Sequence, residues 1–355
     1  MEIDRLSELR QQFKHLGIDG FLVTRCENRE YLSRFTGSDG WLLISNNKAI
    51  LAVDSRYVEQ AKVEASAFEV VYIKGELQDW LPDIVSRLNI TKLGFESWDI
   101  SHALYNKLCN AIQNGTYAFE LIATIDVVES LRTIKDITEI GYIIRAAQLA
   151  DSAMEYAESI IKPGITEEYI AWELEKFLRD QGSEAIPFEI IVASGPNSAL
   201  PHARPSNRAI CKNGPVLIDM GARTKRYCSD ISRTFCYDKS NSRYNEIYDV
   251  VLGAQLTALN TITPGTTGHD ADLFARTVID TAGYGEYFGH GLGHGVGLNV
   301  HESPRIGPNS QDILVEGMVF TVEPGIYIPG WGGIRIEDTV MFKDGKIVSL
   351  NRMHK

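Results

Sequence analysis

The sequence predicts an α+β protein with a smaller N-terminal domain and a larger C-terminal domain. Its 355 residues suit two domains of ~100–200 residues each. Helical and strand patterns alternate through the first part of the chain, which is typical of a small α/β domain with a mixed sheet. A long run of apolar residues at helical spacing then begins near residue 136. We therefore expect domains over residues 1–131 and 132–355.

The N-terminal domain is expected to begin with an amphipathic helix over residues 4–16, with Leu6, Leu9 and Phe13 on one face. Short apolar runs then predict strands, and Asn46-Asn47 predicts a turn between two of them. The expected strands cover residues 20–24, 41–45, 49–53, 68–73 and 92–95, and a second helix covers residues 56–66.

In the C-terminal domain, the helical pattern of residues 136–161 ends at Pro163-Gly164. Lys162-Pro163-Gly164 and Thr263-Pro264-Gly265 each follow one helix-like run and precede another. This echo indicates a domain made of two similar halves. The alternative is that Pro-Gly after a helix is simply common.

Composition and charge exclude several classes of function. The chain is 44% apolar and 23% charged, which is ordinary for a globular protein. Its formal net charge of −12 repels a phosphate backbone, so we expect no nucleic-acid partner. The amphipathic N-terminus lacks the apolar core of a signal peptide, and no run approaches the ~20 apolar residues that span a bilayer. Five cysteines without a CxxC motif favour a reducing compartment, so we expect a cytoplasmic protein without a membrane partner.

Two aspartates are expected to lie close together in the C-terminal domain. An apolar strand over residues 215–220 carries Asp219 at its end. In a second predicted strand, residues 227–235, Asp230 shares a face with Ser232 and Thr234. Two antiparallel strands joined by a short turn would bring the aspartates together.

The segment Gly289–Gly297 contains His290 and His294 at a spacing of four. That spacing is typical of a metalloprotease helix, but five glycines alternate through the segment. Because each glycine costs a helix ~1 kcal/mol relative to alanine, we expect an extended or looping segment. Alternating glycines also let a backbone approach its neighbours closely. His301 follows on the next loop.

Two further carboxylates lie near the end of the chain. Glu323 follows an apolar run and precedes Pro-Gly. Residues 333–340 are predicted to form one strand, with Arg335 and Glu337 on one face. Asp338 falls on the opposite face with the isoleucines, and the pattern predicts no role for it beyond a strand end.

Each of these residues alone has an ordinary interpretation as a cap, a turn or a surface group. Together, however, carboxylates and a histidine at the ends of apolar strands would be costly to bury without a cation. Four carboxylates and one imidazole form a hard donor set, which suits Mn²⁺, Fe²⁺ or Co²⁺ better than structural zinc. Their charge balances two divalent ions, which can activate a shared water and polarise a carbonyl. The five candidate ligands are Asp219, Asp230, His294, Glu323 and Glu337.

In order and context these residues resemble the metallopeptidases of the pita-bread fold, above all the Xaa-Pro aminopeptidases and the Xaa-Pro dipeptidases (prolidases). The resemblance implies a C-terminal pita-bread domain with pseudo-two-fold halves and a creatinase-type N-terminal domain. One departure is Arg226, where the family more often has glycine. The matching motifs are residues 191–198, 200–202, 219–222, 229–234, 290–301, 321–325 and 335–338.

The resemblance also implies roles for individual residues. Asp219 binds one metal ion, Asp230 and Glu337 bridge two ions, and His294 and Glu323 bind the other. Glu323 is additionally implied as the proton shuttle. The residues implied to contact substrate or to orient the site are His202, His290, His301 and Arg335.

On this basis we expect a dinuclear Xaa-Pro aminopeptidase, which releases the N-terminal residue of peptides whose second residue is proline. An Xaa-Pro dipeptidase is the alternative. Residues 35–38, residues 54–57 and Gln60 look more like aminopeptidase P relatives, which favours the aminopeptidase and leaves the dipeptidase open. Distant alternatives are a creatinase-like hydrolase, a methionine aminopeptidase and a binding protein that lost the site, and the intact ligand set argues against the first and last. We expect Mn²⁺ (with Co, Fe or Zn as alternatives), short proline-containing peptides as substrates, and a homodimer.

Overall fold

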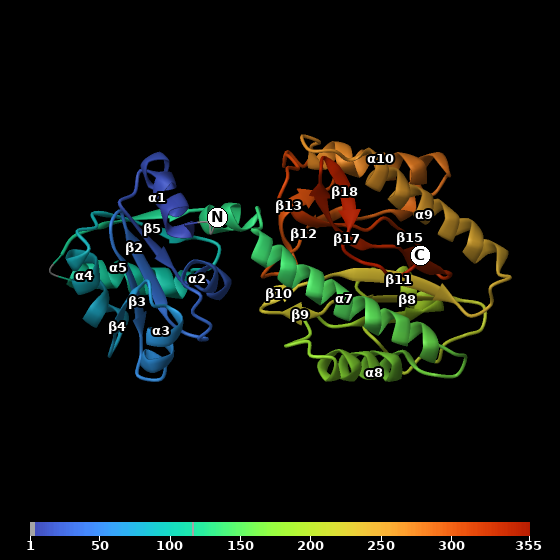
Figure 1. Ribbon diagram of the computed structural model, residues 1–355, viewed down its shortest axis with the longest axis horizontal. Coiled ribbons are helices and arrows are strands. Elements are labelled where there is room, and N and C mark those ends of the chain that lie inside the picture. Colours follow the sequence, from blue (N-terminus) through green and yellow to red (C-terminus); the bar gives the residue numbers. More distant parts are fainter. Residues whose placement is uncertain (1–3, 116) are drawn as a thin grey trace. The chain divides into compact units, whose positions relative to one another are not determined.

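The computed structural model describes residues 4–115 and 117–355. These residues fall into two compact units, Met1–Arg132 and Thr133–Lys355. Figure 1 shows both units, and each is described below by itself.

The N-terminal unit is built around a mixed sheet, as the sequence predicts. In its described part, six strands follow the order β4-β3-β2-β1-β5-β6. β1 pairs antiparallel with β2 and parallel with β5, so the sheet is mixed at its centre. The strands are β1 (Gly20–Val23), β2 (Trp41–Ser45), β3 (Ala49–Val53), β4 (Glu69–Tyr72), β5 (Lys92–Glu96) and β6 (Glu120–Thr124).

The helices of this unit pack apolar side chains against the sheet. The predicted first helix is α1 (Arg5–Leu16); the Asp4 side chain caps it by accepting from the Ser7 N–H, and Gly17 ends it at φ 66°. Leu9 and Phe13 are buried, whereas Leu6 is only partly so. The predicted helix over 56–66 is the shorter α3 (Val58–Glu64). The apolar pattern of the sequence does not predict β6, α2 (Cys26–Ser33), α4 (Leu77–Arg87), α5 (His102–Asn114) or α6 (Val127–Arg132).

The C-terminal unit begins with the predicted long helix, α7 (Ile137–Ile160). Its other helices are α8 (Glu167–Asp180), η1 (Gly195–Ala199), α9 (Ser242–Thr261), α10 (Gly268–Thr281) and η2 (Gly285–Tyr287). Its first strands are β7 (Ile191–Ser194), β8 (Pro215–Met220), β9 (Arg223–Thr224), β10 (Tyr227–Cys228) and β11 (Ile231–Cys236). The later strands are β12 (Gly293–Gly295), β13 (Glu302–Ile306), β14 (Val319–Val322), β15 (Gly325–Ile328), β16 (Gly332–Arg335), β17 (Asp338–Lys343) and β18 (Lys346–Ser349).

The echo of Lys-Pro-Gly and Thr-Pro-Gly corresponds to two similar halves of this unit. After α7, Gly164 adopts φ 93° and its N–H donates to the Ile210 carbonyl; after α9, Gly265 adopts φ 96° and donates to Leu314. Thr166 and Thr267 then cap α8 and α10 through their side chains. α8 and α10 lie on opposite sides of the unit (Figure 1).

The strands of the two halves form the sheets that carry the candidate site residues. In the described residues, the first half contributes the sheet β11-β8-β7 and the second half the sheet β13-β12-β14-β17-β18. A separate hairpin pairs β15 with β16. Two buried apolar clusters, one for each half, fix these sheets against their helices.

Two expected strands are wrong in their extent, because each is interrupted at a candidate ligand. Residues 227–235 form β10 and β11 with a break at Ser229-Asp230. Residues 333–340 form β16 and β17 with a break at Ile336-Glu337. The second break occurs because β16 and β17 belong to different sheets. Where the chain crosses from one sheet to the other, the Glu337 N–H donates to the Ser232 carbonyl.

The turn between β9 and β10 explains the departure at Arg226. Arg226 adopts φ 69°, a left-handed conformation in which glycine carries no Cβ penalty.

Within residues 4–115 and 117–355, no helix has both the length and the apolarity needed to cross a bilayer.

Candidate metal centre

Asp219 and Asp230 meet where β8 and β11 pair. The strands are antiparallel with Asp219 opposite Ser232, and Asp230 lies directly before β11. The expected juxtaposition of the two aspartates is therefore confirmed. The carboxylates of Asp219, Asp230 and Glu337 offer oxygens that all lie within 4.8 Å of one another.

His294 and Glu323 come from the neighbouring sheet of the second half. His294 lies in β12 and Glu323 directly follows β14, and the two strands pair antiparallel. The glycines beside His294 permit this close pairing: a Cβ on Gly293 would lie 2.1 Å from the Thr321 carbonyl oxygen. A Cβ on Gly295 would lie 2.0 Å from the Ser303 carbonyl oxygen. The segment is extended and not helical, as predicted.

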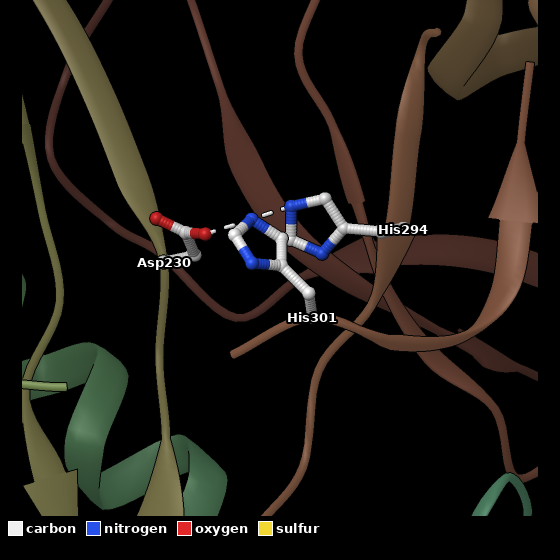
Figure 2. Close-up of side chains that lie close together, drawn as sticks. All are labelled: Asp230, His294 and His301. Atoms are coloured by element: carbon white, nitrogen blue, oxygen red, sulfur yellow. Dashed lines mark ion pairs between the residues drawn. The ribbon is translucent and has the colours of Figure 1, made fainter. Parts of the chain in front are cut away.

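The His294 ring is oriented by the backbone. Its Nδ1 lies 3.1 Å from the Gly295 carbonyl oxygen, which can only accept, so Nδ1 carries a proton. Its Nε2 lies 3.2 Å from Glu323 Oε1 and 3.7 Å from Asp230 Oδ2. Figure 2 shows the Asp230 carboxylate facing His294 and His301. Against burial, which lowers it, the hydrogen bond and charge of Glu323 raise the pKa of His294, so Nε2 would give up its proton when it ligates a metal ion.

The candidate ligands form three overlapping groups, each compact enough to hold one ion. Asp230 and Glu337 each belong to two of the groups, so the structure brings together all five ligands predicted from the sequence. It also adds His301 as a possible donor, which the sequence analysis assigned to substrate contact. The groups are Asp219, Asp230 and Glu337; His294, Glu323 and Glu337; and Asp230, His294 and His301.

Arg335 connects the carboxylates through a buried network. Its guanidinium pairs with Asp219, and its Nε donates to the Ser232 hydroxyl at 2.8 Å. Ser232 in turn donates to Glu337 Oε2 at 2.6 Å. The predicted strand is interrupted between Arg335 and Glu337, but both side chains still contact the Ser232 hydroxyl. The strand pattern places Ser232 on the face of Asp230 but does not predict this link.

The carboxylates lack the hydrogen bonds that buried anions need. Asp219 Oδ1, Asp230 Oδ1 and Glu337 Oε1 are buried, and no donor among the described residues reaches them. Burial raises the pKa of Asp230 well above its usual range, and the Glu337 and Asp219 charges raise it further. Burial likewise raises the pKa of Glu337, with Glu323 and Asp219 adding to it. A cation at these oxygens removes both penalties, so the residues present fit a metal centre.

Glu323 differs from its neighbours in its protonation. Burial alone would raise its pKa, but the hydrogen bond and the charge of His294 lower it to about 2. Its Oε1 also accepts a hydrogen bond from the Thr321 hydroxyl at 3.1 Å. Glu323 is therefore held ionised beside carboxyl groups whose pKa is raised, and the ionised carboxylate is the state required of a base.

A cavity of about 490 Å³ contains these groups together with the predicted histidines. His202 and His301 are exposed at it, and His290 is half-buried. The residues that line the cavity are Phe188, Glu189, Ile191, Pro201, His202, Ala203, Arg204, Asp219, Asp230, His290, Gly291, Gly293, His294, His301, Arg305, Ile306, Glu323, Arg335 and Glu337.

Tyr327 is a residue of this site that the sequence analysis missed. Its hydroxyl accepts from Arg335 at 2.7 Å and lies 2.9 Å from His290 Nε2. His290 Nδ1 faces the Gly291 carbonyl at 2.7 Å, so its Nε2 accepts from the tyrosine. Burial raises the pKa of Tyr327 to about 12, although Arg335 opposes this. The signal available in the sequence was that Tyr327 lies two residues after Gly325, so in a strand both residues lie on the same face.

Comparison with known proteins assigns this site to a family. Residues 141–344 match the model of metallopeptidase family M24, and residues 5–134 match the creatinase/prolidase N-terminal domain. The chain belongs to metallopeptidase family M24. An M24 member is a metal-dependent peptidase, so a hydrolase acting on peptide bonds is confirmed, as is dependence on metal.

Similar M24 proteins span the whole chain. An Xaa-Pro dipeptidase of Pyrococcus horikoshii is 38% identical over 91% of this chain and 90% of its own. The structure of an Xaa-Pro dipeptidase from Bacillus anthracis is 43% identical, with a TM-score of 0.95 over 99% of this chain and 98% of that one. An X-Pro aminopeptidase from Thermotoga maritima is 38% identical, with a TM-score of 0.88 over 97% and 98%. The expected pita-bread fold with a creatinase-type N-terminal domain is confirmed.

Proposed function

We propose that this M24 peptidase is an Xaa-Pro dipeptidase, which hydrolyses the tertiary amide of a dipeptide that ends in proline. This revises the expectation of an aminopeptidase in favour of its alternative. A dipeptidase must bind the free carboxylate of the proline, whereas an aminopeptidase must leave that side open. The observation that carries the proposal is a cation in the cavity with no acidic partner.

That cation is Arg305. Three arginines line the cavity: Arg335 pairs with Asp219, and Arg204 Nε lies 3.3 Å from Glu189. For the Arg305 guanidinium, by contrast, no acidic partner occurs among the described residues. Arginine binds a carboxylate through two parallel hydrogen bonds, so Arg305 is suited to hold the proline carboxylate.

The motifs that favoured an aminopeptidase have a local structural explanation. Gln60 Nε2 donates to Thr36 Oγ1 at 3.0 Å, and Ser38 Oγ lies 2.6 Å from the Tyr57 hydroxyl. These side chains bond to each other within the N-terminal unit, so they are explained by its local structure. Likeness to aminopeptidase P relatives at these positions therefore carries little weight. The dipeptidase names of two of the relatives above support the revised proposal.

Asp219, Asp230, His294, Glu323 and Glu337 would hold the metal ions. Two divalent cations bound there supply a water of lowered pKa and polarise the scissile carbonyl. Glu323 Oε1 accepts a hydrogen bond from the Thr321 hydroxyl, which leaves Oε2 to accept a proton from the attacking water. Glu323 then gives this proton to the proline nitrogen as the amide breaks, because a secondary amine leaves only when protonated.

The other cavity residues orient the substrate and the ligands. Arg335 fixes Asp219 directly and Glu337 through Ser232, which sets the spacing of the carboxylates. The neutral His290, held by Gly291 and Tyr327, lines the cavity. We propose that it packs on the proline ring together with His202, and that His301 contacts the carbonyl oxygen at the cavity mouth.

The metal is proposed to be Mn²⁺, because carboxylate oxygens dominate the donor set and suit this ion. Adding Mn²⁺, Co²⁺, Fe²⁺ or Zn²⁺ separately to metal-free protein and comparing kcat tests this directly. Mn²⁺ should give the highest turnover. We also propose a homodimer, which light scattering of the purified chain checks: a mass near that of one chain contradicts it.

The paired assay of Ala-Pro against Ala-Pro-Ala tests the dipeptidase proposal. We expect Ala-Pro to be hydrolysed with a much higher kcat/KM. Arg305→Ala should lower kcat/KM for Ala-Pro roughly 10- to 100-fold, the effect of losing a charge-assisted hydrogen bond of about 1.5–3 kcal/mol. Arg204→Ala is the matched control, since Glu189 already neutralises that charge.

An aminopeptidase is the second candidate, favoured by the Thermotoga maritima neighbour. Equal or faster hydrolysis of Ala-Pro-Ala, with no effect of Arg305→Ala, establishes it and overturns the dipeptidase. Failure to cleave either peptide under any of the four metals, with the chain folded, overturns both.

A further inference from the structure

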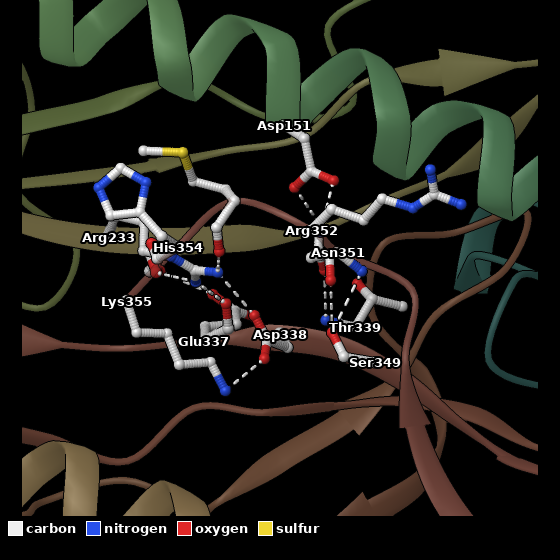
Figure 3. Close-up of polar contacts among 12 residues, drawn as sticks. Asp151, Arg233, Glu337, Asp338, Thr339, Ser349, Asn351, Arg352, His354 and Lys355 are labelled. Carbon is white, nitrogen blue, oxygen red and sulfur yellow. Dashed lines mark hydrogen bonds and ion pairs between the residues drawn. The ribbon is translucent and has the colours of Figure 1, made fainter.

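Asp338, for which the sequence pattern predicts no role, is a buried carboxylate shared by two cations. It is 1% exposed. Arg233 Nη2 donates to its Oδ1 at 2.8 Å, and Lys355 Nζ lies 2.8 Å from its Oδ2 (Figure 3). Asp338 directly follows the candidate ligand Glu337 in the chain. None of these three side chains lines the cavity.

Arg233 joins the backbone of Glu337 to the segment Asn351–Lys355. It is 2% exposed. Its Nη1 donates to the Glu337 carbonyl at 2.6 Å and to the Ser232 carbonyl at 3.0 Å. Its other nitrogens donate to the carbonyls of Met353 at 2.7 Å and His354 at 3.0 Å. One side chain therefore ties the 351–355 segment to a candidate metal ligand.

A second series of hydrogen bonds leads from the same segment to Asp230. Asn351 donates from Nδ2 to Asp151 of α7 at 3.1 Å, and its Oδ1 accepts from the Thr339 N–H at 2.8 Å. The Thr339 hydroxyl donates to the Asp230 carbonyl at 2.7 Å and accepts from the Asp230 N–H at 3.2 Å. Figure 3 shows Asp151 and Asn351 meeting beside Thr339.

We propose that the 351–355 segment positions Asp230 and Glu337 for metal binding. These two residues are the carboxylates that belong to two ligand groups each, so their placement sets both ion positions. Lys355, Asp338 and Arg233 hold the backbone at Glu337, and Asn351 and Thr339 hold it at Asp230. The inference rests on the proposed metal centre.

Physical considerations favour positioning over simple stabilisation. A buried ion pair contributes little net stability, because desolvation offsets its attraction. Metal and catalytic groups, in contrast, must be held within about 0.5 Å of their working geometry. Both routes end on backbone atoms of ligand residues, where a shift moves the carboxylate directly. Arg233, Asp338, Thr339, Asn351 and Lys355 are thus positioning residues and not catalytic ones.

Lys355→Met tests the first route, because it removes the ammonium from a side chain that is only 21% exposed and keeps its length. Calorimetric titration of the metal-free chain with Mn²⁺ should show affinity weakened about 10- to 100-fold, the usual effect of changing a group that supports a ligand. kcat on Ala-Pro should fall while KM stays close to that of the parent. Lys355→Arg should restore most of the affinity.

Thr339→Val tests the second route if Lys355→Met does not fold. It removes the hydroxyl that holds Asp230 with almost no change of shape, and Thr339→Ser keeps that hydroxyl. We expect weaker Mn²⁺ binding by the valine variant alone. Arg352→Ala is the control in the same segment, since its side chain is exposed and only its backbone N–H bonds to Asp151.

A lower unfolding temperature for Lys355→Met and Thr339→Val, with Mn²⁺ affinity and kcat equal to those of the parent, overturns the positioning role. The failure of the metal centre itself is distinguished by the parent chain. A folded parent that binds no Mn²⁺ overturns the proposed function, and the positioning role with it.

Discussion

Two buried glutamates, one in each unit, face opposite surroundings. Glu96 of the N-terminal unit is 6% exposed, and Glu337 of the C-terminal unit is 1% exposed. Glu96 accepts hydrogen bonds from the N–H groups of Thr24 at 2.7 Å and Arg25 at 2.8 Å, and from Asn28 Nδ2 at 2.7 Å. Both its oxygens are therefore engaged.

Glu337 receives one hydrogen bond, from Ser232, and its Oε1 has no donor among the described residues. Burial raises its pKa, and the neighbouring carboxylates Glu323 and Asp219 raise it further. Both glutamates are buried, so burial alone does not identify a functional carboxylate. A buried carboxylate whose oxygens are satisfied by donors is structural, whereas one left with an open oxygen among like charges marks the place of a cation.

The largest expected effect follows from Glu323, whose ionised carboxylate is needed for proton transfer. Glu323→Gln should lower kcat on Ala-Pro about 10²- to 10⁴-fold, the usual contribution of a general base. The far-ultraviolet circular dichroism spectrum should not change. Turnover within tenfold of the parent contradicts the assignment of Glu323 as the base.

The two glutamates themselves should respond oppositely to loss of charge. In metal-free protein at pH 8, Glu337→Gln should stabilise its unit, because burial among like charges raises the pKa of Glu337, so this group costs stability above its ordinary pKa and the neutral amide does not. Glu96→Gln should destabilise its unit by about 1–3 kcal/mol, because the amide nitrogen cannot accept from the surrounding donors. Hydrogen exchange in β16–β17 and in β5, respectively, measures the local stability of each unit.

The test lies in the direction of the two stability changes, which are expected to be opposite. A Glu337→Gln variant whose strands exchange faster than those of the metal-free parent contradicts the view that this carboxylate awaits a cation. Equal effects of the two substitutions erase the distinction between the sites.

The smallest expected effect is the pH dependence of the Glu96 substitution. Burial raises the pKa of Glu96 to about 7 from an ordinary 4.5, against the hydrogen bonds that lower it. The contribution of Glu96 to the free energy of unfolding is therefore fully present below pH 4.5 and is lost as the pH rises through 7. Glu96→Gln has no such loss, so its destabilisation should be smaller at pH 8 than at pH 5. Exchange in β5 measured at both pH values checks this, and a destabilisation that grows with pH contradicts it.

Much of the fold follows from local pattern. The strands over 41–45 and 49–53 and the helix ending before Pro163 match the expectation closely, because apolar period and turn residues specify them. α4 was missed because Pro82 lies inside it. The breaks before β11 and β17 are not predicted by the sequence. Each strand ends at a ligand residue because the chain leaves its sheet there, and a local apolar pattern contains no information about which strands pair.

The site shows the same division. Its five candidate ligands were predicted because unpaired charges at strand ends are conspicuous in a sequence. Tyr327, Ser232 and Arg305 were not assigned, since an ordinary tyrosine, serine or arginine gains its role only from neighbours far away in the chain. Asp338 is the clearest case: its partners Arg233 and Lys355 lie on either side of it in sequence and meet only in the fold.

The central claim is that the open carboxylate oxygens are places for cations. Calorimetric titration of the metal-free chain with Mn²⁺ at pH 7, in two buffers of different ionisation enthalpy, tests it most directly. We expect about two ions per chain and a net release of protons, because burial raises the pKa of Asp230 and of Glu337 in the metal-free chain and each must be ionised to bind metal. A folded chain that binds no Mn²⁺, or binds it without releasing protons, contradicts the account.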